Sequence, residues 1–390
     1  MKTYNVAVLG CGSRGAAAAR AYYDHPRTRL SALCDLVPER CDPLGDELGV
    51  ESRYGDLDRM IGETGPDIVA IPTGTEFHHP LALRVLEYGI HIDIEKPLCV
   101  DLEEADEVVA KAAAKGARIA VHHQGRSGAI MRAVERAYRA GRIGELRHIT
   151  GYGKSYYGGY GLMNIGTHMI NTMLKLAGHC RSVTATGMTD GHPITPADVI
   201  PSAGGMGIVA GEHLTATLDF ENGVTANILQ HRYPKAVNPV MEFCGSEGRL
   251  MVGNLLYMED RKGGMLLPET HYAPGATAAQ WEDLDPIFPD CRRTDGVSHV
   301  EDLWFVEEYV RALDEGRDHE CSGKEGLHVV EVMMGILESA AYGRRVDLPQ
   351  EDRSQPLMRW RREHGLGAPE PMPRGYAEWL EAEDRRLGRC

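Results

Sequence analysis

Short apolar runs alternate with amphipathic stretches along the first 122 residues. The apolar runs are rich in Val, Ile, Leu and Ala and end at Gly, Asp or Pro, which is typical of buried strands. The strands are predicted at 4–9, 30–34, 67–71, 90–94 and 118–121, and the helices at 16–23, 38–48, 80–88 and 102–115. This alternation predicts a parallel sheet with helices on both faces.

From residue 146 the pattern changes to alternating β-branched and polar positions. One helix is predicted at 166–177, and strands are predicted at 146–155, 183–187, 214–220, 224–229, 240–244 and 249–252. The sequence Glu221-Asn222-Gly223 indicates a hairpin between two of the strands. Strands that follow one another without helices predict an antiparallel sheet. Residues 260–296 are rich in Gly and Pro and predict a long excursion, and helices are predicted at 300–313 and 326–341.

Charge and cysteine content narrow the class of protein. Lys and Arg total 42 and Asp and Glu total 57, giving a net charge of −15. A chain this acidic lacks the basic footprint for nucleic acid or an anionic membrane, so neither partner is expected. The nine cysteines form no CxxC pair, so no disulfide framework or metal site is expected. No apolar window is long enough for a transmembrane helix, and the N-terminus lacks a signal-peptide pattern, so we expect a cytoplasmic protein.

A glycine-rich loop, Gly10-Cys11-Gly12-Ser13-Arg14-Gly15, connects the first predicted strand to the first helix. Gly10 permits the sharp turn, Gly12 lets a pyrophosphate approach the backbone, and Gly15 allows close packing of helix on strand. Asp35 closes the second strand, 25 residues after Gly10, where a carboxylate binds ribose hydroxyls and repels a 2′-phosphate. The loop and Asp35 therefore predict bound NAD, with NADP less expected; a glycine turn beside a surface aspartate is the alternative.

Several motifs along residues 4–349 occur together in this chain. They are the glycine loop, Asp35, Ile71-Pro72 with His78, Glu95-Lys96-Pro97, the 139–144 segment RAGRIG, the 322–326 segment SGKEG and the 343–349 segment GRRVDLP. This set resembles the glucose–fructose oxidoreductase / inositol dehydrogenase (Gfo/Idh/MocA) family. The resemblance implies a Rossmann domain, an open antiparallel sheet beneath the active site, a nicotinamide cofactor, a carbohydrate or cyclitol substrate, and a homodimer or homotetramer.

Pattern and resemblance together predict the domain organisation. Residues 1–122 form an α/β Rossmann domain with a doubly wound parallel sheet. Residues 123–349 form an α+β domain with an open, mainly antiparallel sheet, and the helices within 300–341 pack back towards the first domain. Residues 350–390 form a C-terminal arm with four prolines and a helix at 376–387. A chain of 390 residues also exceeds what one hydrophobic core usually serves.

Lys96 is the first predicted catalytic residue. It lies at the carboxyl end of a parallel strand, where such sheets bind ligands, and Pro97 restricts it to an extended conformation. An ammonium beside a hydroxyl stabilises the developing alkoxide, and the resemblance implies this role; a surface ion pair with Glu95 is the alternative. Further cofactor contacts are expected at positions that follow the strands, namely Thr73, His78, Glu95, Lys96 and Gln124.

The second predicted catalytic residue is His168, because an imidazole can accept a hydroxyl proton near neutral pH. Asn164, His168 and Asn171 have i, i+4, i+7 spacing and are predicted to share one helix face. The family commonly has an aspartate at the position of Asn164. An amide orients a hydroxyl but cannot take a proton, so proton transfer is assigned to His168 and substrate binding to the two asparagines.

Weaker candidates surround these groups. Tyrosine rings suit sugar C–H faces, so Tyr156 and Tyr157 are predicted to bind substrate, with an ordinary tyrosine loop as the alternative; Arg126 is a further substrate candidate. Metal binding by His122 and His123 is not expected, because no carboxylate has matching spacing. Other side chains near the predicted pocket are Lys154, Tyr160, His231 and Arg232.

These residues predict an NAD-dependent oxidoreductase that oxidises a secondary hydroxyl of a sugar, cyclitol or glycoside. One alternative is a glycosidase that uses NAD for transient oxidation, elimination and re-reduction. Another is a nucleotide-sensing Rossmann protein without catalytic activity.

Overall fold

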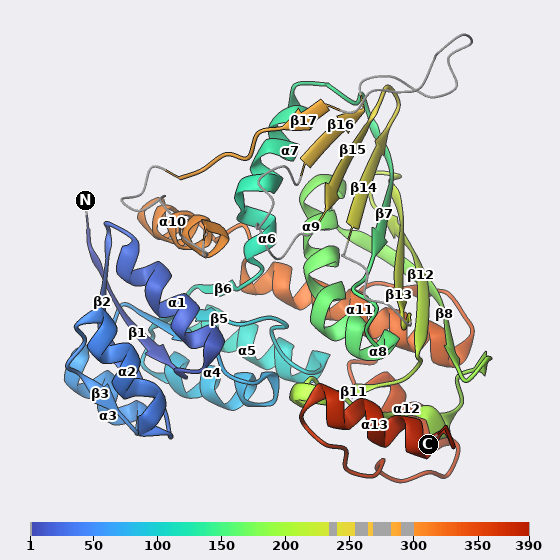
Figure 1. The fold of residues 1–390 in the computed structure, drawn as a ribbon, viewed down its shortest axis with the longest axis horizontal. Helices are drawn as coiled ribbons and strands as arrows, with labels where there is room; N and C mark the ends of the chain where they lie inside the picture. The colour runs from blue at the N-terminus through green and yellow to red at the C-terminus, as the bar shows by residue number, and fades with distance from the viewer. Residues whose placement is uncertain (1, 234–239, 254–263, 268–281, 290–299, 390) are drawn as a thin grey trace. The chain divides into compact units, whose positions relative to one another are not determined.

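The structure is a computed structural model that describes residues 2–233, 240–253, 264–267, 282–289 and 300–389. Its contacts divide the chain into two compact units (Figure 1). Unit 1 comprises Met1–Cys99, Glu104–Ala129 and Phe288–Leu327, and unit 2 comprises Val100–Glu103, Ile130–Ile287 and His328–Cys390.

Unit 1 contains a parallel sheet with strand order β3-β2-β1-β4-β5-β6. The first strand, β1, lies in the middle of the sheet. Strands β2 and β3 are added on one side of β1, and β4, β5 and β6 are added on the other side. This order is that of a dinucleotide-binding fold. The strands are β1 (Tyr4–Leu9), β2 (Thr28–Cys34), β3 (Arg53–Tyr54), β4 (Ile68–Ile71), β5 (His91–Ile94) and β6 (Ile119–Val121). The predicted α/β class is confirmed, whereas β3 was missed because two residues are too short to show a pattern.

Helices connect these strands. They are α1 (Ser13–Asp24), α2 (Pro38–Leu48), α3 (Leu57–Thr64), the 3₁₀ turn η1 (Thr75–Phe77), α4 (His78–Glu87), α5 (Leu102–Lys115), α6 (Gln124–Ser127) and the later α10 (Val300–Asp314). Helix α3 was not predicted; Asp56 caps it by accepting the backbone N–H of Arg59. Tyr22 of α1 and Phe305 and Tyr309 of α10 are fully buried in one core cluster with β1 and β4, so α10 belongs to the core of unit 1.

Unit 2 contains a large mixed sheet with strand order β17-β16-β15-β14-β7-β13-β12-β8-β18, and β9 pairs with β8. Within this sheet, β7 and β13 form the only parallel pair among the described strands, and the other described pairs are antiparallel. The strands are β7 (Leu146–Tyr152), β8 (Cys180–Thr189), β9 (His192–Pro193), β12 (His213–Phe220), β13 (Thr225–His231), β14 (Val240–Gly245), β15 (Arg249–Gly253), β16 (Gly264–Leu267), β17 (Glu282–Leu284) and β18 (Val346–Asp347). The predicted mainly antiparallel sheet and the hairpin at 221–223 are confirmed.

The predicted excursion at 260–296 lies mostly outside the described residues, although β16 and β17 fall within it. The remaining elements of the second half are α7 (Ala129–Arg139), α8 (Gly158–Gly161), the π-helical turn η2 (Leu162–Gly166), α9 (Thr167–Ala177), η3 (Pro196–Asp198), β10 (Ile200–Pro201), η4 (Ala203–Gly205), β11 (Ile208–Val209), α11 (Gly323–Tyr342), α12 (Pro356–Glu363) and α13 (Tyr376–Arg386).

The C-terminal arm packs on unit 2 of its own chain. Trp379 of α13 is fully buried, and its indole N–H donates to the carbonyl of Pro201 at 2.7 Å. Gln355 caps α12 by accepting the N–H groups of Leu357 and Met358. The buried Trp379 side chain anchors the arm, so the arm is an integral part of the second unit.

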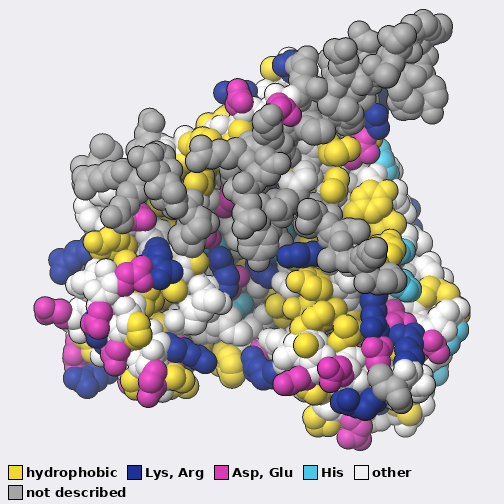
Figure 2. All heavy atoms as spheres, in the orientation of Figure 1, with side chains coloured by type: hydrophobic (Ala, Val, Ile, Leu, Met, Phe, Trp, Pro, Cys, Tyr) yellow, Lys and Arg dark blue, Asp and Glu magenta, His cyan; other side chains and the backbone are white. Residues whose placement is uncertain are grey.

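On the face drawn in Figure 2, Lys and Arg side chains are interspersed with Asp and Glu. Within the described ranges, no helix combines the length and the apolar character needed to cross a bilayer.

Candidate functional site

The glycine loop after β1 has room for a ligand. Gly10 adopts φ +106°, and a Cβ on Gly15 would lie 1.8 Å from the Gly10 carbonyl oxygen, so both positions require glycine. A Cβ on Gly12 would meet nothing within 4 Å. The N-terminus of α1, which starts at Ser13, carries no side-chain cap among the described residues. Free N–H groups above an open backbone fit a bound pyrophosphate.

Asp35 lies directly beneath this loop. Its carboxylate accepts the backbone N–H of Cys11 at 2.7 Å and that of Val37 at 2.9 Å. Arg40 approaches the same carboxylate at 3.8 Å. Asp35 therefore fixes the glycine loop and presents negative charge at the end of β2, where a ribose is expected.

Lys96 and Glu95 follow β5 at the same edge of the sheet. Glu95 accepts the Nε–H of Arg14 at 2.7 Å and the backbone N–H of Lys96 at 3.1 Å. Burial raises the pKa of Glu95, but the cations Arg14, His122 and Lys96 outweigh it and lower the pKa to about 2. The pKa of the half-buried Lys96 is lowered by burial and by Arg14, against the opposing effect of Glu95. The charge of Glu95 thus favours the ammonium form of Lys96, but the pKa of this amine still lies below the ordinary lysine range.

A chain of buried ionic groups continues from Arg14. Its guanidinium donates to Asp302 at 3.1 Å, and the ring of His122 bonds Asp302 at 2.8 Å and Asp93 at 2.9 Å. Tyr22 then donates to Asp93 at 2.8 Å. Burial lowers the pKa of His122, but the two aspartates raise it to about 10, so this histidine is cationic at neutral pH.

Sequence reasoning missed this chain of charges. It weighed His122 only as a metal ligand and did not expect that role. The pairing with Asp302 could not be foreseen, because Asp302 lies 180 residues later in the chain. The one indication in the sequence was the position of His122, which directly follows a predicted strand. The carboxyl ends of such parallel strands are where ligands bind.

The remaining predicted cofactor residues lie along the same edge. His78 is buried between the carbonyls of Pro97 (2.9 Å) and Thr73 (3.3 Å), and burial lowers its pKa. The neutral ring ties the loop after β4 to the loop after β5, which favours a positioning role. Gln124 begins α6.

Arg126 and Lys96 both lie near one buried histidine. Burial, then Lys96, then Arg126 lower the pKa of His123 to about 3. Arg126 also pairs with Glu325 at 2.6 Å. In unit 1, Lys96 follows β5, and Arg126 and the neutral His123 follow β6, so these three residues lie close together.

His168 belongs to α9 in unit 2. This helix packs closely on β7, because a Cβ on Gly151 would lie 2.6 Å from Met169 and 2.9 Å from Met173. His168 and Asn171 are buried, and their i, i+3 spacing places them on one side of α9.

Asn164 lies in the π-helical turn before α9. A π turn shifts the angular register relative to a continuous α-helix, so the predicted i, i+4, i+7 face is regular only from residue 167 onwards. Nδ2 of Asn164 donates to the hydroxyl of Tyr160 at 3.0 Å. This bond orients the amide on the turn that leads to His168.

The two tyrosines predicted to bind substrate have different surroundings. Tyr157 is fully buried, its ring contacts Trp379, and its hydroxyl donates to Glu383 at 3.0 Å. This placement favours a structural role, anchoring the C-terminal arm. Tyr156 instead is half-buried and lines a pocket.

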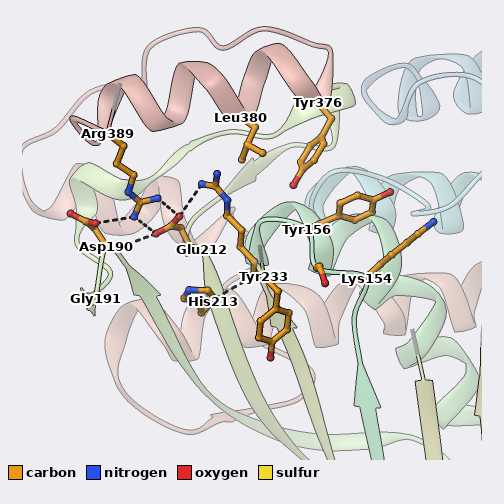
Figure 3. A pocket seen from close by; sticks show the side chains of 12 residues that line it. Lys154, Tyr156, Asp190, Gly191, Glu212, His213, Tyr233, Tyr376, Leu380 and Arg389 are labelled. Carbon is orange, nitrogen blue, oxygen red and sulfur yellow. Dashed lines mark hydrogen bonds and ion pairs between the residues drawn. The ribbon is translucent and has the colours of Figure 1, made fainter. Parts of the chain in front are cut away.

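This pocket of about 720 Å³ lies entirely within unit 2 (Figure 3). Its size falls in the range of small-molecule sites. Lys154 and Arg232, two of the weaker sequence candidates, line it, whereas His231 bonds Thr215 at 2.8 Å. The lining residues are Lys154, Ser155, Tyr156, Asp190, Gly191, Glu212, His213, Arg232, Tyr233, Tyr376, Leu380 and Arg389.

The glycine loop, Asp35 and the strand order define a dinucleotide-binding protein of the Rossmann class with an added α/β domain. Residues 4–123 match the model of an oxidoreductase family with an NAD-binding Rossmann fold, and residues 153–348 match the C-terminal α/β domain of the same family. The chain belongs to the Gfo/Idh/MocA oxidoreductase family. The predicted family, the oxidoreductase class and NAD as cofactor are confirmed.

Similar proteins extend over most of the chain. D-apiose dehydrogenase of Rhizobium rhizogenes is 22% identical over 361 residues, covering 88% of this chain and 96% of that protein. D-glucoside 3-dehydrogenase of Escherichia coli is 25% identical over 369 residues, covering 88% and 97%. The structure of levoglucosan dehydrogenase in complex with NADH and L-sorbose has a TM-score of 0.74 at 19% identity, covering 90% of this chain and all of that one; it supports the fold.

Proposed function

We propose that this protein is an NAD-dependent dehydrogenase that oxidises a secondary hydroxyl of a sugar, cyclitol or glycoside. Gly10, Gly12, the N-terminus of α1 and Asp35 would hold the dinucleotide. When bound, NAD⁺ supplies the acceptor for the hydride that leaves the carbinol carbon. His168 takes the hydroxyl proton, and the ammonium of Lys96 stabilises the oxygen as negative charge develops on it.

The observation that carries the proposal is the environment of Lys96. The amine stands at the edge of the sheet where the glycine loop and Asp35 also lie, and Glu95 is bonded to Arg14 of that loop. An amine with a lowered pKa, close to the loop that is predicted to bind the nucleotide, suits chemistry on a hydroxyl. The names of the similar dehydrogenases agree with a carbohydrate substrate.

The proposal is tested with the purified full-length protein, NAD⁺ and a panel of sugars, cyclitols and glycosides. We expect stoichiometric NADH from at least one of them. Glycoside cleavage without net NADH would instead identify the redox-neutral glycosidase, and the absence of both reactions would refute an enzymatic role on carbohydrates.

Cofactor preference should depend on the charge of Asp35. Asp35→Asn keeps an oxygen that can accept the Cys11 N–H and removes the charge that repels a 2′-phosphate. Arg40 is then released to pair with such a phosphate. We expect the ratio of kcat/KM for NAD⁺ to that for NADP⁺ to fall about tenfold, the effect of roughly 1.4 kcal/mol. An unchanged ratio would place the ribose elsewhere.

We infer that Asp302 and His122 are positioning residues that set the charge around Lys96 through Arg14 and Glu95. Asp302→Asn removes a negative charge, so the pKa of Lys96 should fall and the alkaline limb of the kcat/KM profile should move to lower pH. His122→Gln removes a positive charge, so the limb should move to higher pH. We expect opposite shifts of about one pH unit. Shifts in the same direction in the two variants would indicate only structural damage.

The expected cytoplasmic location and the homodimer or homotetramer stay predictions. Sedimentation of the purified protein tests the assembly.

A further inference from the structure

The C-terminal arm contributes an aromatic wall to the pocket in unit 2. Tyr376 of α13 points into the same space as Tyr156 of the loop after β7 (Figure 3), with their ring centroids 5.0 Å apart. Leu380, one turn further along α13, also lines the pocket. The arm follows the family's C-terminal domain, whose match ends at residue 348, so Tyr376 and Leu380 lie outside the matched segment.

The polar side of the pocket is held by ion pairs. Arg389 pairs with Glu212 and, at 2.9 Å, with Asp190. Arg232 forms two bonds to Asp384, at 2.7 and 2.8 Å. These side chains are fixed by their mutual bonds, and their opposite charges nearly balance. We call these paired side chains the rim of the pocket. The rim can form hydrogen bonds to the hydroxyl groups of a ligand, and its balanced charge gives the pocket no strong preference for an ionic ligand.

The pocket adjoins the turn that leads to His168. The rings of Tyr156 and Tyr160 are 5.3 Å apart in a T-shaped arrangement, and the hydroxyl of Tyr160 accepts a hydrogen bond from Asn164. Tyr160 also stacks on Tyr376, with ring centroids 4.5 Å apart. A ligand on the aromatic wall is therefore separated by one tyrosine from the amide predicted to orient the substrate.

We propose that this pocket is a carbohydrate subsite that binds a second sugar ring, linked to the ring that is oxidised. The inference rests on the proposed function and narrows its substrate to a disaccharide or a glycoside with a sugar aglycone. Aromatic faces stack on the C–H faces of a sugar ring while the rim binds its hydroxyls. The pocket volume of about 720 Å³ is large enough for more than one sugar ring.

The test measures binding to the full-length protein by ligand-observed NMR titration, with cellobiose, maltose and lactose as disaccharides and glucose and galactose as monosaccharides. Tyr376→Ala should weaken binding of the preferred disaccharide about tenfold and leave monosaccharide binding unchanged. Tyr376→Phe keeps the stacking face and should stay within about threefold of wild type. Tyr23→Ala, at an exposed tyrosine of unit 1, is the control and should have no effect.

Tyr376 also accepts the backbone N–H of Tyr157, so its replacement could disturb the fold. A second variant therefore separates loss of the subsite from misfolding. Leu380→Trp fills the pocket, keeps Tyr376, and should likewise abolish the advantage of the disaccharide. If both variants leave disaccharide binding unchanged, or weaken monosaccharides equally, the subsite is refuted even when NADH forms. If disaccharide binding depends on Tyr376 while no sugar yields NADH, the subsite stands and the dehydrogenase proposal fails.

Discussion

Replacing Lys96 with methionine is expected to lower kcat/KM for sugar oxidation about 10³-fold, with KM for NAD⁺ little changed. Methionine keeps much of the length and the apolar character of the lysine side chain but removes the ammonium. Loss of one preorganised group that stabilises a developing oxyanion typically has this effect, equivalent to roughly 4 kcal/mol. Initial rates of NADH formation across a range of sugar and NAD⁺ concentrations provide the measurement.

Lys96→Arg is the matched control, because it keeps a positive charge. Burial and Arg14 lower the pKa of Lys96, so the wild-type ammonium is lost below the ordinary lysine range and the rate should fall there on the alkaline side. A guanidinium stays protonated, so the Arg variant should be slower but lack this alkaline fall. Equal activity in the wild type and the Met variant would remove Lys96 from the mechanism.

Replacing His168 with asparagine is expected to lower kcat by about 10³-fold at neutral pH. The amide occupies part of the space of the imidazole but cannot accept a proton, and general-base catalysis typically contributes 10² to 10⁴-fold. The rate of the variant should rise with pH and with added imidazole, because hydroxide or the free base then takes the proton. Steady-state kinetics over a pH series make the measurement.

His148→Asn is the control for this variant. His148 is a half-buried histidine on β7 of the same unit, bonded to Thr225 at 2.9 Å. Its replacement should leave kcat unchanged. If His168→Asn raises KM for the sugar and leaves kcat intact, His168 binds substrate and another group accepts the proton.

Local pattern was sufficient for much of unit 1. The run of apolar residues that forms β4 is fully buried. In the loop after β1, Gly10 is required by its positive φ and Gly15 by a close contact with the backbone of Gly10. The sequence spacing predicts both features. The pattern could not reveal β3, which has two residues, or the cap of α3 at Asp56. Such features depend on single contacts rather than on a repeat.

The partners of the site residues depend on contacts between distant segments. His122 meets Asp302, 180 residues later, and Tyr157 meets Tyr376, 219 residues later. No local spacing relates such pairs, so the buried charges near Lys96 and the aromatic wall of the arm could not be predicted. For the same reason, Tyr157 was predicted on a pocket wall, although its hydroxyl bonds Glu383 in the interior.

A crystal structure of the protein with NADH and a sugar substrate tests the central claim most directly. The account predicts that Nζ of Lys96 and a ring nitrogen of His168 both lie within hydrogen-bond distance of one sugar oxygen, on the carbon that faces the nicotinamide. A complex in which these two groups bind different oxygens, or in which either one points away from the sugar, would contradict it.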